Sequence, residues 1–386
     1  MEDDKQVDNI CFIIAAYPTE DDPVFAFAKQ LIFRIADAGV KCTVVSPYSA
    51  ISYILKSRKF RPYHWVDKTE RGSVIDIYQP MKISISNFKL FGYKVSHFFT
   101  MHSIFRTIKK VCIKETVLYG HFWDKGIIAA KIGYKMNWPV FVASGESVIN
   151  VRDCFPEKFI SKYKNNINGV ICVSKKNLNE TIINDLAIEE KCNIIPNAID
   201  KRVFYIEDKK KLRARFGYGE DDFIVAFTGE FSERKGVLRL AKAIDLIGDI
   251  KSIFIGSGKQ RPDCGGILFC GRLPHNEIVH YLNCADVFVL PTLAEGCCNA
   301  IIEAMACGLP VISSNLSFND DILNADCAIR IDPINCDEIA DAIRMLKKDA
   351  ELRNRMSIAA HELSKEMDID NRANRIIDFI QEKITM

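Results

Sequence analysis

The feature that most constrains this chain is a series of short, continuous apolar runs with amphipathic helical patterns between them. In the N-terminal half these runs cover residues 10–16, 42–46, 116–119, 140–143 and 169–174. Runs of this length without alternation are typical of strands that are buried on both faces of a parallel sheet. Because parallel strands need crossover helices, the pattern predicts a doubly wound α/β domain.

A second series of the same kind follows the segment Pro196-Asn197. Its apolar runs cover residues 223–227, 252–255, 267–270, 287–290 and 311–314, and its helical patterns cover 237–247, 276–283 and 299–306. At 386 residues the chain has the length of two domains of ordinary size. We therefore predict an α/β protein with two Rossmann-like, doubly wound domains that face a cleft. The predicted boundaries are 1–190 and 191–365, with 366–386 as a C-terminal helix that returns toward the N-terminal domain.

The composition is that of a globular, cytoplasmic protein. Charged residues make up 26% of the chain and the net charge is +2, which argues against a nucleic-acid partner. The fourteen cysteines include no Cys-x-x-Cys pair and have no histidine cluster beside them, so we expect reduced thiols and no metal site. No apolar run has the length of a membrane span, and the acidic residues 2–4 do not begin a signal peptide.

Two acidic residues, Glu295 and Glu303, follow the strand expected at 287–290, one before a short helix and one inside it. Ligands of parallel sheets bind beyond the carboxyl ends of the strands, and the free N–H groups of a helix N-terminus suit a phosphate. The pattern predicts that Glu303 binds a ribose, that Glu295 reaches a second sugar, and that four residues between them bind phosphates. These four are Gly296, Cys297, Cys298 and Asn299. Taken alone, the stretch is explained equally well by a solvated loop acid and a helix-surface acid.

The residues around this stretch resemble the signature of glycosyltransferase family four. The resemblance rests on Glu295, Gly296, Glu303, Gly308 and Pro310, and it extends over nearly the whole chain. It implies the GT-B fold and a retaining, metal-independent transfer of a sugar from a nucleotide-diphosphate sugar. This donor is a co-substrate, so no further cofactor is expected. The implied acceptor is a saccharide or lipid-linked saccharide, in the assembly of a cell-surface polysaccharide or glycolipid.

Further segments resemble the donor site of this family. In the segment 229–236 the resemblance assigns the donor phosphates to Arg234 and Lys235. The forked hydrogen bonds of a guanidinium and the compact charge of an ammonium suit a pyrophosphate, whereas a solvated basic turn is the alternative. The nucleotide itself is assigned, together with Glu303, to Gly256, Gly258, Arg272 and Leu273.

The resemblance is weaker in the N-terminal domain. Relatives often carry a His-Gly pair after one of its strands, where the histidine contacts the donor sugar, but this chain has Ser144-Gly145 followed by Glu146. We assign Glu146 to the catalytic group together with Glu295. Two alternatives stay open: a catalytically silent nucleotide-sugar-binding or partner subunit, and a GT-B-type nucleotide-sugar epimerase, which needs no acceptor.

Residues 77–114 contain no acidic side chain, but cations and aromatic rings are interleaved along them. The cations are Lys82, Lys89, Lys94, Arg106, Lys109, Lys110 and Lys114, and the rings are Phe88, Phe91, Tyr93, Phe98, Phe99 and Phe105. Such a mixture suits peripheral contact with an anionic membrane at its inner face, or a lipid-diphosphate acceptor. Aromatic side chains in the core below solvated lysines are the alternative. The expected partners are thus a nucleotide-sugar donor and a saccharide or lipid-linked acceptor, with membrane contact left open.

Overall fold

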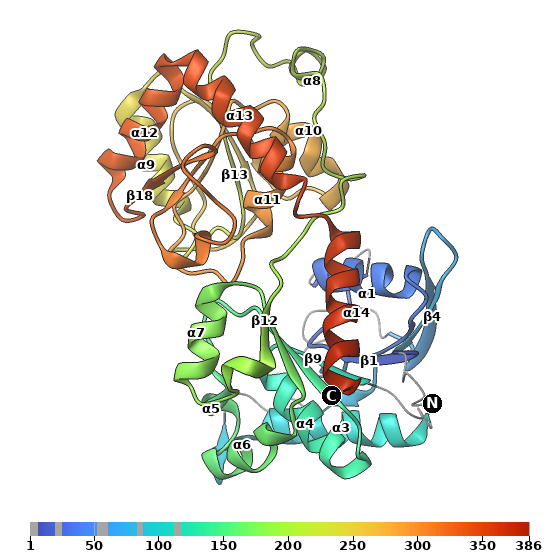
Figure 1. Cartoon of the computed structure of the whole chain (residues 1–386). Helices are drawn as coiled ribbons and strands as arrows, with labels where there is room; N and C mark the ends of the chain where they lie inside the picture. The colour runs from blue at the N-terminus through green and yellow to red at the C-terminus, as the bar shows by residue number, and fades with distance from the viewer. Residues whose placement is uncertain are drawn as a thin grey trace. The chain divides into compact units, whose positions relative to one another are not determined.

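The structure is a computed structural model that describes residues 7–19, 25–49, 51, 61–82, 88–111 and 117–385. The chain divides into two compact units, each built around its own parallel or mainly parallel sheet (Figure 1). Unit 1 comprises residues 1–195 and 370–386, and unit 2 comprises residues 196–369. The chain passes into unit 2 at Pro196, directly before Asn197, and unit 1 receives almost all of the last helix.

Unit 1 contains an eight-stranded sheet in the order β12-β11-β10-β9-β1-β2-β5-β4. Its strands are β1 (Asn9–Ile13), β2 (Lys41–Val45), β4 (His64–Lys68), β5 (Val74–Tyr78), β9 (Val117–His121), β10 (Val140–Ser144), β11 (Gly169–Cys172) and β12 (Cys192–Ile194). All neighbouring strands are parallel except β4 and β5, which are antiparallel. Strands β9, β10 and β11 are buried along their whole length, as expected of strands covered on both faces.

Helices cover both faces of this sheet. On one face α3 (Val95–Lys110), α4 (Trp123–Met136) and α6 (Glu157–Tyr163) bury their apolar side chains, and on the other α1 (Ala26–Asp37) and α14 (Ile369–Thr385) do so. The shorter elements of the unit are α5 (Val151–Cys154), α7 (Lys175–Ile183), β3 (Tyr48–Ser49), β6 (Met81–Lys82), β7 (Lys89–Leu90) and β8 (Tyr93–Lys94). Strands β7 and β8 form a hairpin that leads into α3.

Unit 2 contains a six-stranded, fully parallel sheet in the order β15-β14-β13-β16-β17-β18. Its strands are β13 (Ile224–Thr228), β14 (Lys251–Ile255), β15 (Ile267–Gly271), β16 (Val287–Leu290), β17 (Val311–Ser314) and β18 (Ala328–Ile331). Its helices are α8 (Lys209–Phe216), α9 (Val237–Ile247), α10 (Ile278–Leu282), α11 (Asn299–Ala306), α12 (Cys336–Lys348) and α13 (Ala350–Ser364). The order 3-2-1-4-5-6 is that of dinucleotide-binding sheets, in which the switch point lies between the first and fourth strands.

The predicted α/β class with two doubly wound units is confirmed, and α9, α11, β16 and β17 have the bounds expected from the sequence. The helix expected at 276–283 is instead a 3₁₀ turn at His275–Glu277 followed by the shorter α10. Within the basic and aromatic stretch 77–114, residues 83–87 and 112–114 lie outside the described residues. Within the described ranges, no helix combines the length and the apolar character that a membrane crossing requires.

Candidate active site

The predicted donor residues of unit 2 gather where two loops leave the sheet at its switch point. Strand β13 is followed by the loop 229–236, and its neighbour β16 is followed by the loop 291–298. Both strands are parallel, so both loops leave the same carboxyl edge of the sheet. The two loops are in contact, because Leu293 N donates a hydrogen bond to Arg234 O at 2.8 Å. This is the place where doubly wound sheets bind their ligands.

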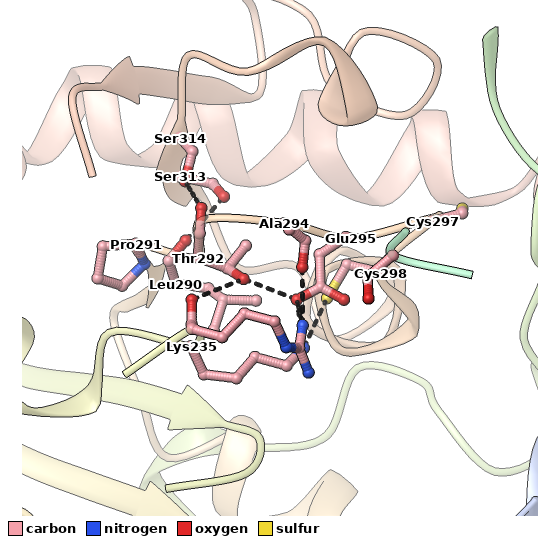
Figure 2. A network of polar contacts seen from close by, with 12 residues as sticks. Lys235, Leu290, Pro291, Thr292, Ala294, Glu295, Cys297, Cys298, Ser313 and Ser314 are labelled. Carbon is pink, nitrogen blue, oxygen red and sulfur yellow. Dashed lines mark hydrogen bonds and ion pairs between the residues drawn. The ribbon is translucent and has the colours of Figure 1, made fainter. Parts of the chain in front are cut away.

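The carboxylate of Glu295 is the centre of a polar network at this point (Figure 2). Its Oε1 lies 2.8 Å from Arg234 Nη1, 2.6 Å from Lys235 Nζ and 2.7 Å from the hydroxyl oxygen of Thr292. Arg234 Nη1 also donates to the carbonyl of Ala294 at 2.7 Å. The two cations assigned to the donor phosphates and the acid assigned to the donor sugar are therefore in direct contact.

Lys235 is the more enclosed of the two cations. Its side chain is 12% exposed, against 37% for Arg234. Burial by itself lowers the pKa of Lys235, but Cys298 and Glu295 raise it, and the net pKa lies above its ordinary value. Burial raises the pKa of the Cys298 thiol to about 11, so at neutral pH this neighbour, 3.9 Å from the ammonium, is uncharged. Glu295 is therefore the charged partner that holds Lys235 at neutral pH.

The loop that carries Glu295 is fixed by hydrogen bonds on both sides of this residue. The hydroxyl of Ser314, at the end of β17, donates to the carbonyl of Thr292 at 2.5 Å (Figure 2). On the other side, the amide Nδ2 of Asn197 donates to the carbonyl of Cys297 at 3.0 Å. The Pro-Asn segment that the sequence singled out thus holds the loop of the donor residues in place.

The same loop ends at the N-terminus of α11. Gly296 and Cys297 lie between Glu295 and this helix, and Cys298 is its N-cap residue, with an extended backbone and no capping hydrogen bond from its side chain. The first backbone N–H that bonds back into this turn is that of Ile301. The N–H groups before it, together with the positive end of the helix dipole, suit phosphate oxygens. The amide oxygen of Asn299 is buried and has no hydrogen-bond partner within the described part of the chain.

Glu303 lies within α11 and has a different partner. Its side chain is 9% exposed, and its Oε1 lies 3.1 Å from His275 Nε2 in the turn before α10. Burial lowers the pKa of His275, but the hydrogen bond and the charge of Glu303 raise it above its ordinary value. The ring of Phe204 packs edge-on against the imidazole at 5.1 Å. In the same loop after β15, Arg272 is exposed and Leu273 is half-buried.

Gly256 and Gly258 allow the loop after β14 to pack closely against the loop after β13. A Cβ atom at Gly256 would lie 1.8 Å from the carbonyl oxygen of Gly229, and one at Gly258 would lie 2.2 Å from that of Phe231. Phe231 N donates to the carbonyl between the two glycines, at 3.0 Å. Only a residue without a side chain fits such an approach, so both glycines shape the edge of the predicted donor site.

Glu146, the second predicted catalytic residue, belongs to unit 1. Its Oε1 accepts a hydrogen bond from Trp123 N at 2.5 Å, and its Oε2 accepts one from Gly145 N at 3.0 Å. Trp123 is the first residue of α4, so the carboxylate lies at the N-terminus of this helix. Burial raises the pKa of Glu146 to about 7. The neighbouring Ser144 is fully buried, and its hydroxyl accepts a hydrogen bond from Trp123 Nε1 at 3.1 Å.

Two residues of unit 2 that touch the predicted site were missed from the sequence. Thr292 lies three residues before Glu295. It could have been found from the sequence, because it places a hydroxyl just after a buried strand and close to an acid. His275 follows Arg272 and Leu273, which were assigned to the nucleotide, but its contact joins it to Glu303 across 28 positions, which no local spacing reveals. The structure brings Arg234, Lys235 and Glu295 together. Glu303, in the helix that follows this loop, instead contacts His275.

Comparison with known sequences relates the chain to glycosyltransferases. Residues 208–363 match the family model described as Glycosyl transferases group 1. The Bacillus subtilis glycosyltransferase TuaC, provisionally named for teichuronic acid biosynthesis, is 24% identical over 351 residues, which cover 86% of this chain and 88% of the relative. An Escherichia coli protein named UDP-Gal:alpha-D-GlcNAc-diphosphoundecaprenol alpha-1,3-galactosyltransferase is 30% identical over 171 residues, which cover 39% of this chain and 43% of the relative.

Comparison with solved structures concerns the fold. The HepE protein of Anabaena, solved in complex with UDP-glucose, matches with a TM-score of 0.69 at 15% identity, covering 96% of this chain and 98% of that chain. At this identity the likeness shows the fold alone. That fold is GT-B, so the fold predicted from the sequence is confirmed.

Proposed function

Because the chain carries a group 1 glycosyl transferase domain on a GT-B fold, it is a glycosyltransferase, and we propose that its donor is a nucleotide-diphosphate sugar. The proposed reaction moves the sugar to a saccharide or lipid-linked saccharide, with retention of anomeric configuration and without a metal ion. The names of the relatives support this assignment, since one is named for teichuronic acid and another for a diphosphoundecaprenol-linked acceptor. We place the reaction in polysaccharide or glycolipid assembly.

One observation carries the proposal: Lys235 and Arg234 meet Glu295 beside the open N-terminus of α11, at the switch point of the sheet. A nucleotide-diphosphate sugar has its two phosphates between the ribose and the sugar that is transferred. The proposed donor therefore has its phosphates at the two cations and the helix N-terminus, its ribose at Glu303, and its transferred sugar at Glu295. HepE, which shares the fold, was solved with a donor of this chemical class.

The chemistry follows from where charge develops. When the bond between the sugar and the diphosphate breaks, the leaving diphosphate gains negative charge, which Lys235, Arg234 and the N–H groups of α11 stabilise. In the free protein these cations are held by Glu295, so the donor meets charges that are already oriented. The proposed independence of a metal ion rests on these two cations, which supply positive charge at the phosphates. Glu146, whose pKa is raised to about 7, can exchange a proton near neutral pH, and we keep it as the second catalytic group.

The donor assignment is tested by binding, with Lys235→Ala compared with Lys242→Ala. Lys242 is an exposed residue of α9 and serves as a control of equal charge change. Measured by calorimetry, Lys235→Ala is expected to weaken the binding of a nucleoside diphosphate by about 1.5–3 kcal/mol and to leave the binding of the nucleoside nearly unchanged. UDP, GDP and ADP are compared first, so that the nucleotide with the highest affinity is used. Equal losses for nucleoside and diphosphate would place Lys235 away from the phosphates.

A catalytically silent nucleotide-sugar-binding subunit is the second candidate. Ser144 stands where relatives often have a histidine, and its hydroxyl is buried against Trp123, so it offers no replacement for an imidazole at a donor sugar. The two candidates differ in turnover. A transferase forms product from the preferred donor and a saccharide or lipid-linked acceptor, in the presence of EDTA, with the anomeric configuration of the donor retained by NMR. A silent subunit binds the donor and forms no product.

A further inference from the structure

Unit 1 contains a cationic cavity that the donor site does not use. It has a volume of about 810 Å³ and lies between α3, the small strand β6 and the residues just before β4. Its basic lining residues are Lys82, His102, Arg106, Lys109 and Lys110. None of the described residues that line it is acidic. Such a surface attracts an anion and repels a cation.

Lys82 makes this cavity more than a group of surface lysines. Its ammonium donates a hydrogen bond to the hydroxyl of Thr100 at 2.9 Å, and no carboxylate pairs with it among the described residues. Asp124 of α4, the acid whose charge acts on Lys82, is already engaged by Lys125 at 2.5 Å and His97 at 3.3 Å. Burial and the neighbouring charge of Lys125 lower the pKa of Lys82 to about 8, although Asp124 acts in the opposite direction. Lys82 is thus a half-buried cation that is held by a hydroxyl and has no ion-pair partner among the described residues.

Apart from the hydroxyls of Ser103 and Thr107, the rest of the lining is apolar or aromatic. Pro80, Met81 and Phe99 lie beside the cations, and the side chain of Met81 is 61% exposed. The ring of Tyr63 also lines the cavity and carries the ammonium of Lys110 above it at 5.1 Å. Cations beside an exposed apolar rim fit a molecule that joins a phosphate to a hydrocarbon chain.

We propose that this cavity binds the phosphate or diphosphate group of an amphiphilic acceptor, with Lys82 and Arg106 as its anion-binding side chains. The inference rests on the proposed transfer to a lipid-linked acceptor and names the part of that acceptor that the protein recognises. The position of Lys82 in the lining of the cavity, where this residue is half-buried, separates this proposal from general attraction to a charged membrane. A single phosphate group can enter the cavity and reach Lys82, whereas a flat bilayer surface meets only exposed side chains.

The test uses farnesyl diphosphate as a soluble probe and the full chain. Lys82→Met removes the charge, keeps most of the length of the side chain and takes away a half-buried cation that has no ion-pair partner among the described residues, so the variant is expected to fold. It should bind farnesyl diphosphate at least about tenfold more weakly than the wild type, and Arg106→Gln should weaken binding in the same direction. Lys158→Met, at an exposed position of α6, is the matched control and should bind like the wild type.

The donor site also attracts diphosphates, so the two sites must be separated. Lys235→Ala should keep the farnesyl diphosphate affinity and lose nucleoside diphosphate affinity, and Lys82→Met should show the reverse pattern. If nucleoside diphosphate binding is lost in neither variant while Lys82→Met loses farnesyl diphosphate, the donor assignment fails and the cavity proposal stands. If Lys82→Met binds farnesyl diphosphate like the wild type, the cavity proposal is overturned.

The pH dependence of farnesyl diphosphate binding distinguishes a direct contact with Lys82 from a merely structural role, because a structural role would not make binding depend on the charge of this lysine. A bound phosphate favours the charged ammonium, so binding should be strongest below pH 8 and weaken as the pH rises above it. The groups that face Lys82 are Lys125 and Asp124 of α4 and the basic side chains of α3 that line the cavity. Vesicles of phosphatidylcholine with and without phosphatidylglycerol complete the test. Lys82-dependent binding to anionic vesicles without binding of farnesyl diphosphate would assign the surface to a membrane and refute the proposal.

Discussion

Glu295→Gln is the substitution whose outcome separates the roles within the donor site. The glutamine keeps the size of the side chain and can still accept the hydrogen bond of Thr292, which lies 2.7 Å from Oε1. It removes the negative charge that Lys235 and Arg234 share at 2.6 and 2.8 Å. The free protein is then left with two neighbouring cations and no counter-charge between them.

The magnitude follows from the exposure of the two partners. The pair with Lys235, whose side chain is 12% exposed, is of the kind worth about 1.5–3 kcal/mol. The pair with Arg234, which is 37% exposed, contributes less than about 1 kcal/mol after solvent screening. We expect the free energy of unfolding of the ligand-free protein to fall by about 2–3 kcal/mol. A bound diphosphate supplies the missing negative charge, so its affinity should be unchanged or should rise, by up to about 30-fold for 2 kcal/mol.

The assay measures three quantities on Glu295→Gln: the unfolding free energy in urea, the nucleoside diphosphate affinity by calorimetry, and turnover with donor and acceptor. Turnover should fall by about 10²-fold, the effect of losing about 2.7 kcal/mol of transition-state stabilisation. Glu233→Gln in the same loop is the control, because Glu233 is 68% exposed and pairs with Arg239 instead. The reasoning is refuted if diphosphate affinity collapses together with turnover, since Glu295 would then hold the nucleotide itself.

Three further predictions concern the surrounding residues. Because burial raises the pKa of Glu146 from 4.5 to about 7, the wild type should lose stability as the pH rises through this interval, and Glu146→Gln should not. If the melting temperatures of the two proteins change in parallel between pH 5 and 8, the prediction is wrong. His275→Ala leaves Glu303 without its hydrogen-bond partner, so it should lower the affinity for a nucleoside diphosphate roughly fivefold and leave the affinity for the 2′,3′-dideoxy analogue unchanged. His275→Gln should restore part of the affinity, and an equal loss for both ligands would argue against a ribose contact. Gly256→Ala should lower the free energy of unfolding in urea by more than about 3 kcal/mol, because its Cβ atom would lie 1.8 Å from a carbonyl oxygen. Gly217→Ala, at a position with open space around it, should lower it by about 1 kcal/mol. Similar values for the two variants would show that the loops after β13 and β14 can separate.

The sheet strands and the acid-bearing loop of unit 2 could be predicted because their signals are local. Strand β16 is a run of four buried apolar residues, and α11 ends where Gly308 takes a positive φ of 73° that favours glycine. Glu295 and the cations at 234 and 235 lie in loops whose positions follow from the parallel strand order. Once two parallel strands are neighbours, the loops at their carboxyl ends meet without any further information from the sequence.

The contacts that lie outside these loops could not be predicted, because they depend on tertiary packing. The alternation of unit 1 predicted its central strands, but it gave no sign that β4 would pair antiparallel at the edge or that α3 would follow a hairpin. Gly256 was interpreted as a nucleotide contact, and the structure adds a packing reason for it that arises from the loop after β13. Lys82 belonged to a basic stretch in the sequence, but only the fold shows that this lysine lines a cavity while Asp124 is engaged by Lys125.

The two cationic sites differ in whether an acid pairs with the lysine in the free protein, and this difference predicts that the KM values of donor and acceptor depend differently on pH. Lys235 is paired with Glu295 in the free protein and its pKa is raised, so donor binding should persist as the pH rises from 7 to 9. Lys82 has no acidic partner among the described residues and its pKa is lowered to about 8, so an acceptor phosphate should be bound less well over the same interval. A rise in the acceptor KM above pH 8 at constant donor KM would then locate the titrating group in the cavity of unit 1. A parallel rise in both values would instead trace the pH dependence to a group that the two substrates share.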